Sequence, residues 1–220
     1  MSAIADNLAR VRAGLPPGVT LVAVSKTWPA EAVREAYAAG QRDFGENYAQ
    51  EWREKADALA DLADLVWHFI GSLQTNKVKY LAGRVGWVHT VDRLALAQEL
   101  SRRSVARGAT TRVLVEVNVA GEASKAGCAP GDVPALAHAT AALPGLALRG
   151  LMCIPPAEGD PRPHFAALRA LRDSLGLPLP DLSMGMSGDY REAIAEGATL
   201  VRVGTAIFGA RPPPAAAPRG

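Results

Sequence analysis

Apolar positions along the chain form short runs that alternate with stretches of helical periodicity. Leu21-Val22-Ala23-Val24 is apolar throughout, which is typical of a parallel strand buried on both faces. In the stretch before it, Ile4, Leu8 and Val11 recur at helical spacing between polar residues. The same alternation continues along the chain and predicts about eight strand–helix units.

The predicted strands cover residues 19–25, 43–45, 66–70, 86–90, 113–119, 146–153, 182–184 and 200–203. The predicted helices cover residues 2–13, 29–37, 49–65, 74–81, 92–107, 133–142, 164–175 and 189–196. Ser2 and Asp92 are the expected N-caps of the first and the fifth of these helices.

This number of units in 220 residues favours an α/β fold, a single (β/α)₈ TIM barrel with an extra N-terminal helix. An open, doubly wound sheet is the alternative. No linker divides the chain, so residues 1–210 are predicted to form one domain. The Pro- and Ala-rich residues 211–220 are expected to be a disordered or extended tail.

Composition narrows the class of protein. The chain is 49% hydrophobic and 21% charged with a net charge of +2, which is ordinary for a globular protein. It has no basic face, so no nucleic-acid partner is expected, and no signal sequence or apolar run of bilayer length. Cys128 and Cys153 lack metal-site spacing. We therefore expect a cytoplasmic protein with reduced thiols, no metal and no membrane contact.

Lys26 is the first candidate for chemistry, because it follows the first apolar strand where α/β folds place ligands. A partly desolvated lysine amine can attack an aldehyde and form a Schiff base. The alternative is that Lys26 ends the strand and extends its charged tip into water. Of the 24 basic residues only five are lysines, and Lys26 alone ends a long apolar strand, which favours the chemical role.

Two loops near the carboxyl terminus have the chemistry of an anion site. Residues 183–189 contain Ser187 and Gly188, and residues 203–209 contain Gly204 and Thr205. Glycines allow close backbone approach, and hydroxyls and free amides donate hydrogen bonds to an anion. Barrels often bind phosphate between the loops after strands seven and eight. The alternative is that Ser187 and Thr205 are only helix caps.

Arg202 lies within the last apolar strand and shares one face with Leu200 and Gly204. A guanidinium facing the barrel interior is the favoured interpretation, and an ion pair with Glu116 is the alternative. Further polar residues lie in or after other strands. Asn47 could bind a ligand or shape a turn, and His68 could be a buried histidine satisfied by a neighbour. His89, His138 and His164 receive no role.

Several blocks of the sequence match one known family in order and cover nearly the whole chain except the tail. They are Ala23-Val24-Ser25-Lys26-Thr27, Phe44-Gly45-Glu46-Asn47, Trp67-His68-Phe69-Ile70-Gly71, Gln74-Thr75-Asn76-Lys77, Gly150-Leu151-Met152, Ser183-Met184-Gly185-Met186-Ser187 and Arg202-Val203-Gly204-Thr205-Ala206-Ile207-Phe208-Gly209. On these blocks the chain resembles the pyridoxal phosphate homeostasis protein family.

The resemblance implies a barrel similar to the N-terminal domain of alanine racemase, with pyridoxal 5′-phosphate held as a Schiff base on Lys26. By the same resemblance, the phosphate would be held by the two loops and the pyridine nitrogen would face Arg202, which weakens the cofactor as an electron sink. The cofactor-binding residues expected on this basis are Lys26, Asn47, His68, Ser187, Gly188, Arg202, Gly204 and Thr205.

Three functions remain open at this stage. The favoured one is a non-catalytic carrier that buffers or delivers pyridoxal phosphate, a monomer with pyridoxal-phosphate-dependent apoenzymes as transient partners. The alternative is an amino-acid racemase. In alanine racemase an additional domain of the partner subunit supplies a catalytic tyrosine, and we expect no such domain here because the chain ends soon after the last predicted strand. The third is a Schiff-base aldolase acting on a phosphorylated sugar, which would share the lysine and the phosphate loops.

Overall fold

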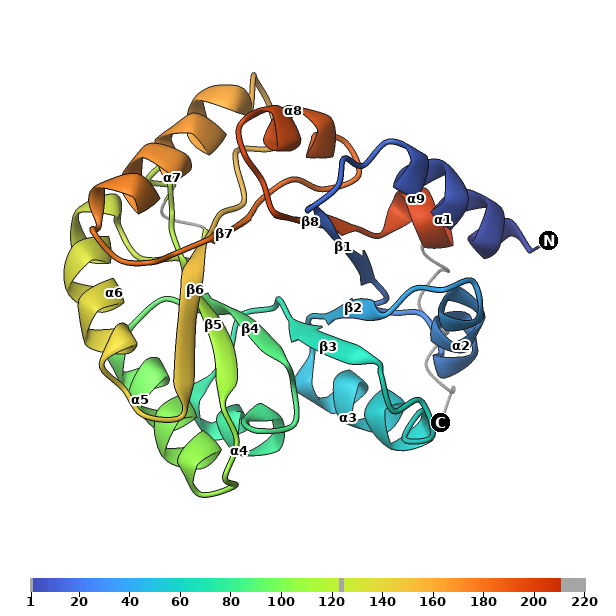
Figure 1. The fold of residues 1–220 in the computed structure, drawn as a ribbon, viewed down its shortest axis with the longest axis horizontal. Helices are drawn as coiled ribbons and strands as arrows, with labels where there is room; N and C mark the ends of the chain where they lie inside the picture. Colours follow the sequence, from blue (N-terminus) through green and yellow to red (C-terminus); the bar gives the residue numbers. More distant parts are fainter. Residues whose placement is uncertain (1, 123–124, 211–220) are drawn as a thin grey trace, which may run out of the picture.

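A computed structural model describes residues 2–122 and 125–210, and these fold into a closed barrel of eight parallel strands in chain order. Helices surround the barrel (Figure 1). The (β/α)₈ prediction is confirmed and the open sheet is wrong. Residues 211–220, the predicted tail, lie outside the described residues.

The strands are β1 (Thr20–Val24), β2 (Asp43–Glu46), β3 (Val66–Phe69), β4 (Trp87–Val91), β5 (Thr111–Glu116), β6 (Leu146–Met152), β7 (Asp181–Ser183) and β8 (Leu200–Val203). The α-helices are α1 (Ala3–Ala13), α2 (Ala30–Ala38), α3 (Ala49–Ala58), α4 (Val78–Leu81), α5 (Leu94–Val105), α6 (Val133–Ala141), α7 (Arg162–Ser174), α8 (Tyr190–Ala195) and α9 (Thr205–Phe208). Two short 3₁₀ helices, η1 (Thr75–Lys77) and η2 (Pro130–Asp132), precede α4 and α6.

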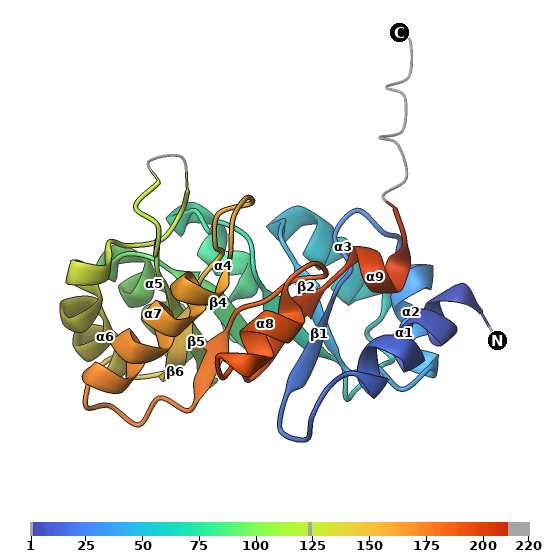
Figure 2. The same cartoon turned by 90° about the horizontal axis from the view of Figure 1, so that it is seen from above.

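The first and last strands close the barrel. Thr20 to Ala23 of β1 pair in register with Leu200 to Val203 of β8. Helix α1 begins at Ser2, whose hydroxyl accepts the Ala5 amide as expected for an N-cap. It lies beside α9, and the Asn7 side-chain amide donates to the Ile207 carbonyl at 2.9 Å (Figures 1 and 2). The extra N-terminal helix therefore covers the seam between β1 and β8.

The apolar residues form two separate clusters. The larger one lies between strands and helices, and a smaller one fills the barrel interior with the side chains of Val22, Trp87, Leu114, Met152 and Leu200. Strand residues alternate between these clusters because successive side chains point to opposite faces. The interior cluster fills the lumen of the barrel, so a ligand site is expected at a rim and not inside the lumen.

Some predicted boundaries differ from the structure. The helix expected over 49–65 ends at Ala58, and residues 59–65 form short turns instead. Asp92 does not cap α5, and its carboxylate forms an ion pair with Arg93. Arg93 is the N-cap residue of α5, and its side chain makes no hydrogen bond to the amides of the first turn. The fifth strand starts earlier and ends earlier than predicted, at Thr111 and Glu116.

Strand β4 contains an irregularity that matters for the interior. Val88 pairs with Val113 and Val91 with Val115, so β4 has one residue more than β5 over this stretch. Such a bulge changes the direction of nearby side chains. It lies next to His89, which is fully buried.

None of the helices in the described part of the chain is both long enough and apolar enough to cross a membrane.

Gly150 provides a test of the barrel geometry. An ideal Cβ at this position would lie 1.7 Å from the carbonyl oxygen of Asp181, a backbone atom of the paired strand β7. We expect Gly150→Ala to lower the free energy of unfolding by about 2–4 kcal/mol, because the strands must separate. Gly131→Ala is the matched control, since its Cβ would meet nothing within 4 Å. Equal denaturation midpoints for the two variants would contradict the close approach of β6 and β7.

Candidate functional site

Lys26 lies in a tight turn directly after β1. The Trp28 amide donates to the Ser25 carbonyl at 3.0 Å, so residues 25–28 close a four-residue turn with Lys26 at its second position. Thr27, at the third position, has φ of 67°. This left-handed conformation is rare for a β-branched residue and must be held by its surroundings.

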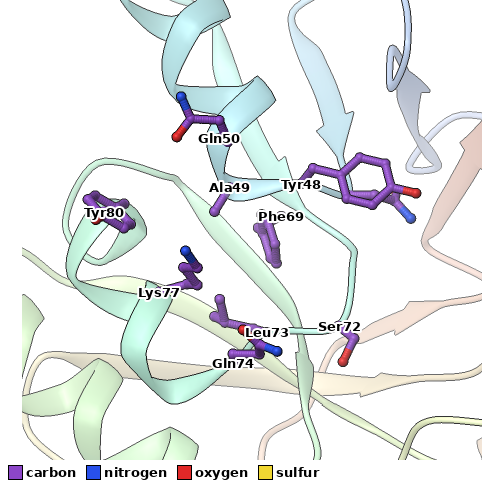
Figure 3. A pocket seen from close by; sticks show the side chains of 10 residues that line it. Tyr48, Ala49, Gln50, Phe69, Ser72, Leu73, Gln74, Lys77 and Tyr80 are labelled. Atoms are coloured by element: carbon purple, nitrogen blue, oxygen red, sulfur yellow. The ribbon is translucent and has the colours of Figure 1, made fainter. Parts of the chain in front are cut away.

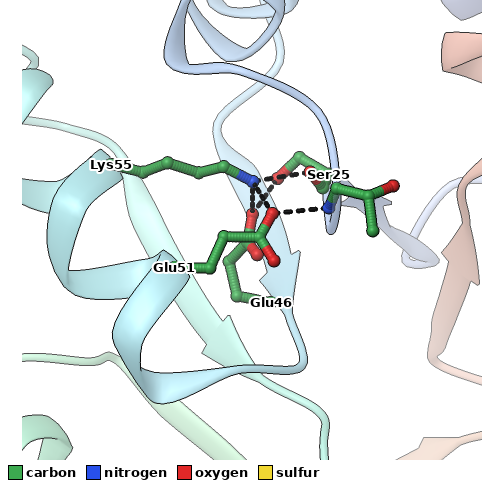
Figure 4. A network of polar contacts seen from close by, with 5 residues as sticks. Ser25, Glu46, Glu51 and Lys55 are labelled. Atoms are coloured by element: carbon green, nitrogen blue, oxygen red, sulfur yellow. Dashed lines mark hydrogen bonds and ion pairs between the residues drawn. The ribbon is translucent and has the colours of Figure 1, made fainter. Parts of the chain in front are cut away.

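The buried ammonium group of Lys55 holds the turn through hydrogen bonds (Figure 4). Lys55 Nζ, on α3, donates at 2.7 Å to each of three oxygens, the Ser25 carbonyl and the carboxylates of Glu46 and Glu51. The Ser25 hydroxyl donates to the same Glu46 oxygen at 2.6 Å. The Thr27 amide donates to the Glu51 carboxylate. Bonds on both sides of Lys26 therefore connect the strained turn to β2 and α3.

Burial dominates the electrostatics of this network. The Glu46 side chain is fully buried, and burial raises the pKa of its carboxyl to about 7, although the Lys55 ammonium opposes the rise. A buried ion pair is stable only with good geometry and additional hydrogen bonds. Lys55 donates three hydrogen bonds and Glu46 Oε1 accepts two, which explains how a lysine can lie on the inner face of α3, while Glu46 Oε2 is buried without a partner among the described residues.

The carboxyl ends of the strands surround a cavity of about 260 Å³. Its lining residues are Val24, Lys26, Asn47, Ile70, Ile154, Met186, Ser187, Gly188, Arg202, Gly204 and Thr205. Of the eight residues predicted from the sequence, this list contains seven. A cavity of this size fits one small molecule, and its wall carries an amine, a guanidinium, hydroxyl groups and the Asn47 amide beside apolar side chains.

Backbone amides converge on the Ser187 hydroxyl. The Gly204 and Ala206 amides donate to its oxygen at 3.3 Å and 3.5 Å, which are long bonds. These amides could exchange such weak contacts for bonds to an anion. Gly188, beside Ser187, has open space where a Cβ would be. Neither Ser187 nor Thr205 is the N-cap residue of α8 or α9, whose N-caps are Asp189 and Gly204, but the Ser187 hydroxyl accepts two amides at the start of α9 from the neighbouring loop.

The lysine turn and the anion loops are packed against each other. The rings of Trp28, two residues after Lys26, and Phe208, in α9, stack with centroids 5.9 Å apart. An ideal Cβ at Gly204 would lie 3.2 Å from the Val24 carbonyl oxygen. Loops far apart in sequence therefore face one cavity at a distance set by close packing.

Arg202 extends into the barrel from β8 and is buried. Its two terminal nitrogens donate to the Ser183 hydroxyl at 2.6 Å and to the Cys153 carbonyl at 2.9 Å. Burial lowers the pKa of this guanidinium. The structure shows no ion pair between Arg202 and Glu116 among the described residues, so neutral oxygens replace the partner considered from the sequence.

Glu116 ends β5 with only 5% of its surface exposed. Burial raises the pKa of its carboxyl to about 7, Asp92 adds to this rise, and Arg202 opposes it. The Glu116 carbonyl accepts the Cys128 amide at 2.9 Å, which holds the loop after β5 against the strand.

His68 lies deeper than the cavity and is not among the residues that line it. It is fully buried, and its two ring nitrogens lie 2.9 Å from His89 Nε2 and from an Asp43 carboxylate oxygen. These contacts agree with the interpretation of His68 as a buried histidine whose ring nitrogens both bond to neighbouring side chains. Asn47 does line the cavity, and its buried Oδ1 has no hydrogen-bond partner among the residues that the structure describes.

A second cavity, of about 350 Å³, adjoins the first through Asn47 (Figure 3). Tyr48, Gln50, Gln74, Lys77 and Tyr80 contribute its polar groups. Tyr48 is 59% exposed at its edge. This cavity contains no residue of the two anion loops.

Sequence reasoning missed Lys55, Glu46 and His89. For Lys55 a signal was present, because Trp52 and Lys55 are three residues apart and share the inner face of α3. A charge on an apolar helix face suggests a buried partner. His89 gave no comparable signal, since its contacts are with residues on other strands.

The family profile and the sequence relatives that match this chain point to the same family. A family profile described as the alanine racemase N-terminal domain matches residues 1–212. A pyridoxal phosphate homeostasis protein of Pseudomonas aeruginosa is 54% identical over 224 residues, covering 96% of this chain and 97% of the relative. The protein of the same name from Escherichia coli is 44% identical over 229 residues, covering 96% and 98%.

Solved structures agree with the sequence relatives. PipY of Synechococcus elongatus, solved without pyridoxal phosphate, superposes with a TM-score of 0.90 at 44% identity, covering 94% of this chain and all of PipY. PipY with pyridoxal phosphate bound gives 0.88 at 43% identity, with the same coverage. Alanine racemase of Corynebacterium glutamicum, at 18% identity and a TM-score of 0.74, covers 96% of this chain and 62% of the racemase, and shows the fold alone.

We predict that Lys55→Met destabilises the protein by about 3–5 kcal/mol, because it leaves two carboxylates without their buried cation. The double variant Lys55→Met/Glu46→Gln should recover part of this loss in urea denaturation. Lys79→Met, a change of the same type at an exposed lysine, should stay within about 0.5 kcal/mol of wild type. Equal effects at Lys55 and Lys79 would show that the turn is held in another way.

Glu116 predicts a pH dependence of stability. Its folded pKa of about 7 lies above the ordinary value of 4.5, so the folded state binds the proton more tightly than the unfolded chain. The contribution to stability is complete below pH 4.5 and is lost as the pH rises through 7. Glu116→Gln should remove about 2 kcal/mol of the difference in unfolding free energy between pH 5 and pH 8. Glu158→Gln on the surface is the control, and a Glu116→Gln profile that parallels wild type would contradict the prediction.

Proposed function

The chain belongs to the pyridoxal phosphate homeostasis protein family, and from that premise we propose that it binds pyridoxal 5′-phosphate in the cavity at the barrel rim. We propose further that it acts as a carrier that buffers or delivers this cofactor. The observation that carries the proposal is that Lys26, Arg202 and the Ser187–Gly204 amide cluster line one small cavity.

Each end of the cofactor has a suitable partner on the cavity wall. Its aldehyde supplies a carbon that an amine can attack, and Lys26 is the amine that would hold it as a Schiff base. The Gly204 and Ala206 amides, with the hydroxyls of Ser187 and Thr205, would hold the phosphate. The open backbone at Gly188 leaves space beside these donors. Asn47 Oδ1 is buried without a protein partner and would accept a hydrogen bond from the cofactor.

Arg202 is the candidate partner of the pyridine nitrogen. A guanidinium donates hydrogen bonds and stays charged, so it disfavours a second positive charge on the ring. An unprotonated ring nitrogen withdraws electrons weakly, which limits catalysis at the substrate α-carbon. This property supports binding without turnover.

The lining of the cavity also argues against a racemase. Racemisation needs an acid–base group on each face of the α-carbon, and Lys26 could serve one face. Among the described residues that line the cavity there is no tyrosine, histidine or carboxylate to serve the other. The names of the sequence relatives, which refer to homeostasis, support the non-catalytic proposal.

Three further properties that the sequence analysis predicts remain predictions. They are the cytoplasmic location, the monomeric state and transient contact with pyridoxal-phosphate-dependent apoenzymes.

The test uses purified protein loaded with pyridoxal 5′-phosphate. Condensation of the Lys26 amine with the aldehyde releases one water and leaves a C=N bond, which borohydride reduces by adding a hydride to its carbon. We expect a visible absorption band that borohydride abolishes, with the added mass on the peptide that contains Lys26. Lys26→Ala should lose the band, and the exposed control Lys79→Ala should keep it.

Two results would contradict the proposal. The trapped cofactor could lie on another lysine with Lys26 unmodified, which would exclude the assigned site. Alternatively, wild type could exchange the α-proton of an amino acid with D₂O at a rate that Lys26→Ala abolishes, which would establish the racemase. A cofactor bound on Lys26 without such exchange supports the carrier.

A further inference from the structure

An unbroken line of polar side chains runs through the barrel from the cavity toward the opposite rim. Arg202 donates to the Ser183 hydroxyl at 2.6 Å, and this oxygen lies 2.9 Å from His89 Nδ1. His89 Nε2 lies 2.9 Å from His68 Nδ1, and His68 Nε2 lies 2.9 Å from an Asp43 carboxylate oxygen. The five residues come from β8, β7, β4, β3 and β2 (Figure 1).

Water is excluded from the middle of this line. Ser183, His68 and His89 are fully buried, whereas the Asp43 side chain at the far end is 28% exposed. The Trp87 ring stacks on His68 with centroids 5.6 Å apart and an interplanar angle of 9°. Burial holds the pKa of His89 well below its usual value, and the nearby Arg202 and His68 lower it further. Burial also lowers the pKa of His68, although Asp43 opposes this. Burial therefore favours the neutral form of both rings.

The carboxylate at one end determines the direction of every bond. An ionised carboxylate only accepts, so His68 donates to Asp43 from Nε2. A neutral His68 then accepts at Nδ1 from His89 Nε2, and a neutral His89 accepts at Nδ1 from the Ser183 hydroxyl. The Ser183 oxygen remains free to accept from Arg202, which can only donate. All donors thus point from Arg202 toward Asp43, and both histidines are Nε2–H tautomers.

We propose that His68 and His89 are positioning residues that orient Arg202 toward a ligand in the cavity, a role that rests on the proposed pyridoxal phosphate site. The two bonds from Arg202, to Ser183 and to the Cys153 carbonyl, fix the plane of the guanidinium. The Ser183 oxygen faces Arg202 as an acceptor because the Ser183 hydroxyl donates its hydrogen bond to His89 Nδ1. His89 can accept this bond at Nδ1 because its own bond to His68, and through His68 to Asp43, sets its tautomer.

The first test needs no cofactor. The chain has four histidines, so a ¹⁵N-histidine spectrum of the purified protein at pH 7 is simple to assign. We expect His68 and His89 to be neutral Nε2–H tautomers. In Asp43→Asn the terminal group can donate as well as accept, so part of the His89 population should change to the Nδ1–H tautomer although residue 43 does not touch His89. A charged or Nδ1–H His89 in wild type, or an unchanged His89 in Asp43→Asn, would overturn the proposal.

The second test links the line to the ligand. His89→Leu should weaken pyridoxal phosphate binding roughly tenfold, the value of about one lost hydrogen bond. His89→Gln, whose amide can accept from Ser183 and donate to His68, should restore most of the affinity and the wild-type visible band. His138→Leu, at an exposed histidine outside the line, is the control. Wild-type affinity in a folded His89→Leu variant would overturn the positioning role.

The two tests separate the two proposals. Absence of a pyridoxal phosphate band in wild type would contradict the proposed function. The histidine tautomers of the cofactor-free protein would still test the hydrogen-bonded line from Arg202 to Asp43. If His89→Leu does not fold, the Asp43→Asn spectrum decides, because Asp43 lies at the partly exposed end of the line.

Discussion

The three bonds of the Lys55 ammonium hold the turn at the end of β1, and the position of Lys26 depends on them. A turn with a β-branched residue at φ of 67° does not persist without external support. Here the support comes from α3 and β2, so Lys26 is placed by residues about 20 to 30 positions away in the chain. The stacking of Trp28 on Phe208 then places this turn opposite the anion loops. A rigid scaffold of this kind is what precise placement of a ligand-binding group requires.

The barrel interior combines two environments that are normally separate. An apolar cluster that includes Val22, Leu114 and Met152 excludes water from the lumen. The line from Arg202 to Asp43 passes through the same interior, where any unpaired polar group would be costly. Each member of the line meets its neighbour at 2.6–2.9 Å, so the polar groups are satisfied without water. The bulge in β4 beside His89 shows how the backbone accommodates this arrangement.

The sequence predicted the barrel and most of the rim, because both depend on local information. Strand parity places Arg202 and Gly204 on the inner face, and parallel strands bring all carboxyl ends to one rim. Lys55 and His89 depend on contacts across strands, which the chain order does not reveal. His68 was expected among the cofactor-binding residues but does not line the cavity, since parity shows which face a residue occupies but not its depth. Helix ends such as Ala58 were missed because loops compete with helices by small energies.

The direction of the hydrogen bonds bears on why a barrel with a reactive lysine would bind a cofactor without turnover. In the arrangement proposed for the line, every donor points away from the cavity and both histidines are neutral. To supply a proton to a group beside Arg202, the line would have to reverse each bond, and Asp43 would have to carry a proton in order to donate to His68. A ring nitrogen facing Arg202 would therefore stay unprotonated and a weak electron sink. On this argument the polar line does more than satisfy buried groups, because in the proposed arrangement it would disfavour protonation of a ring nitrogen beside Arg202.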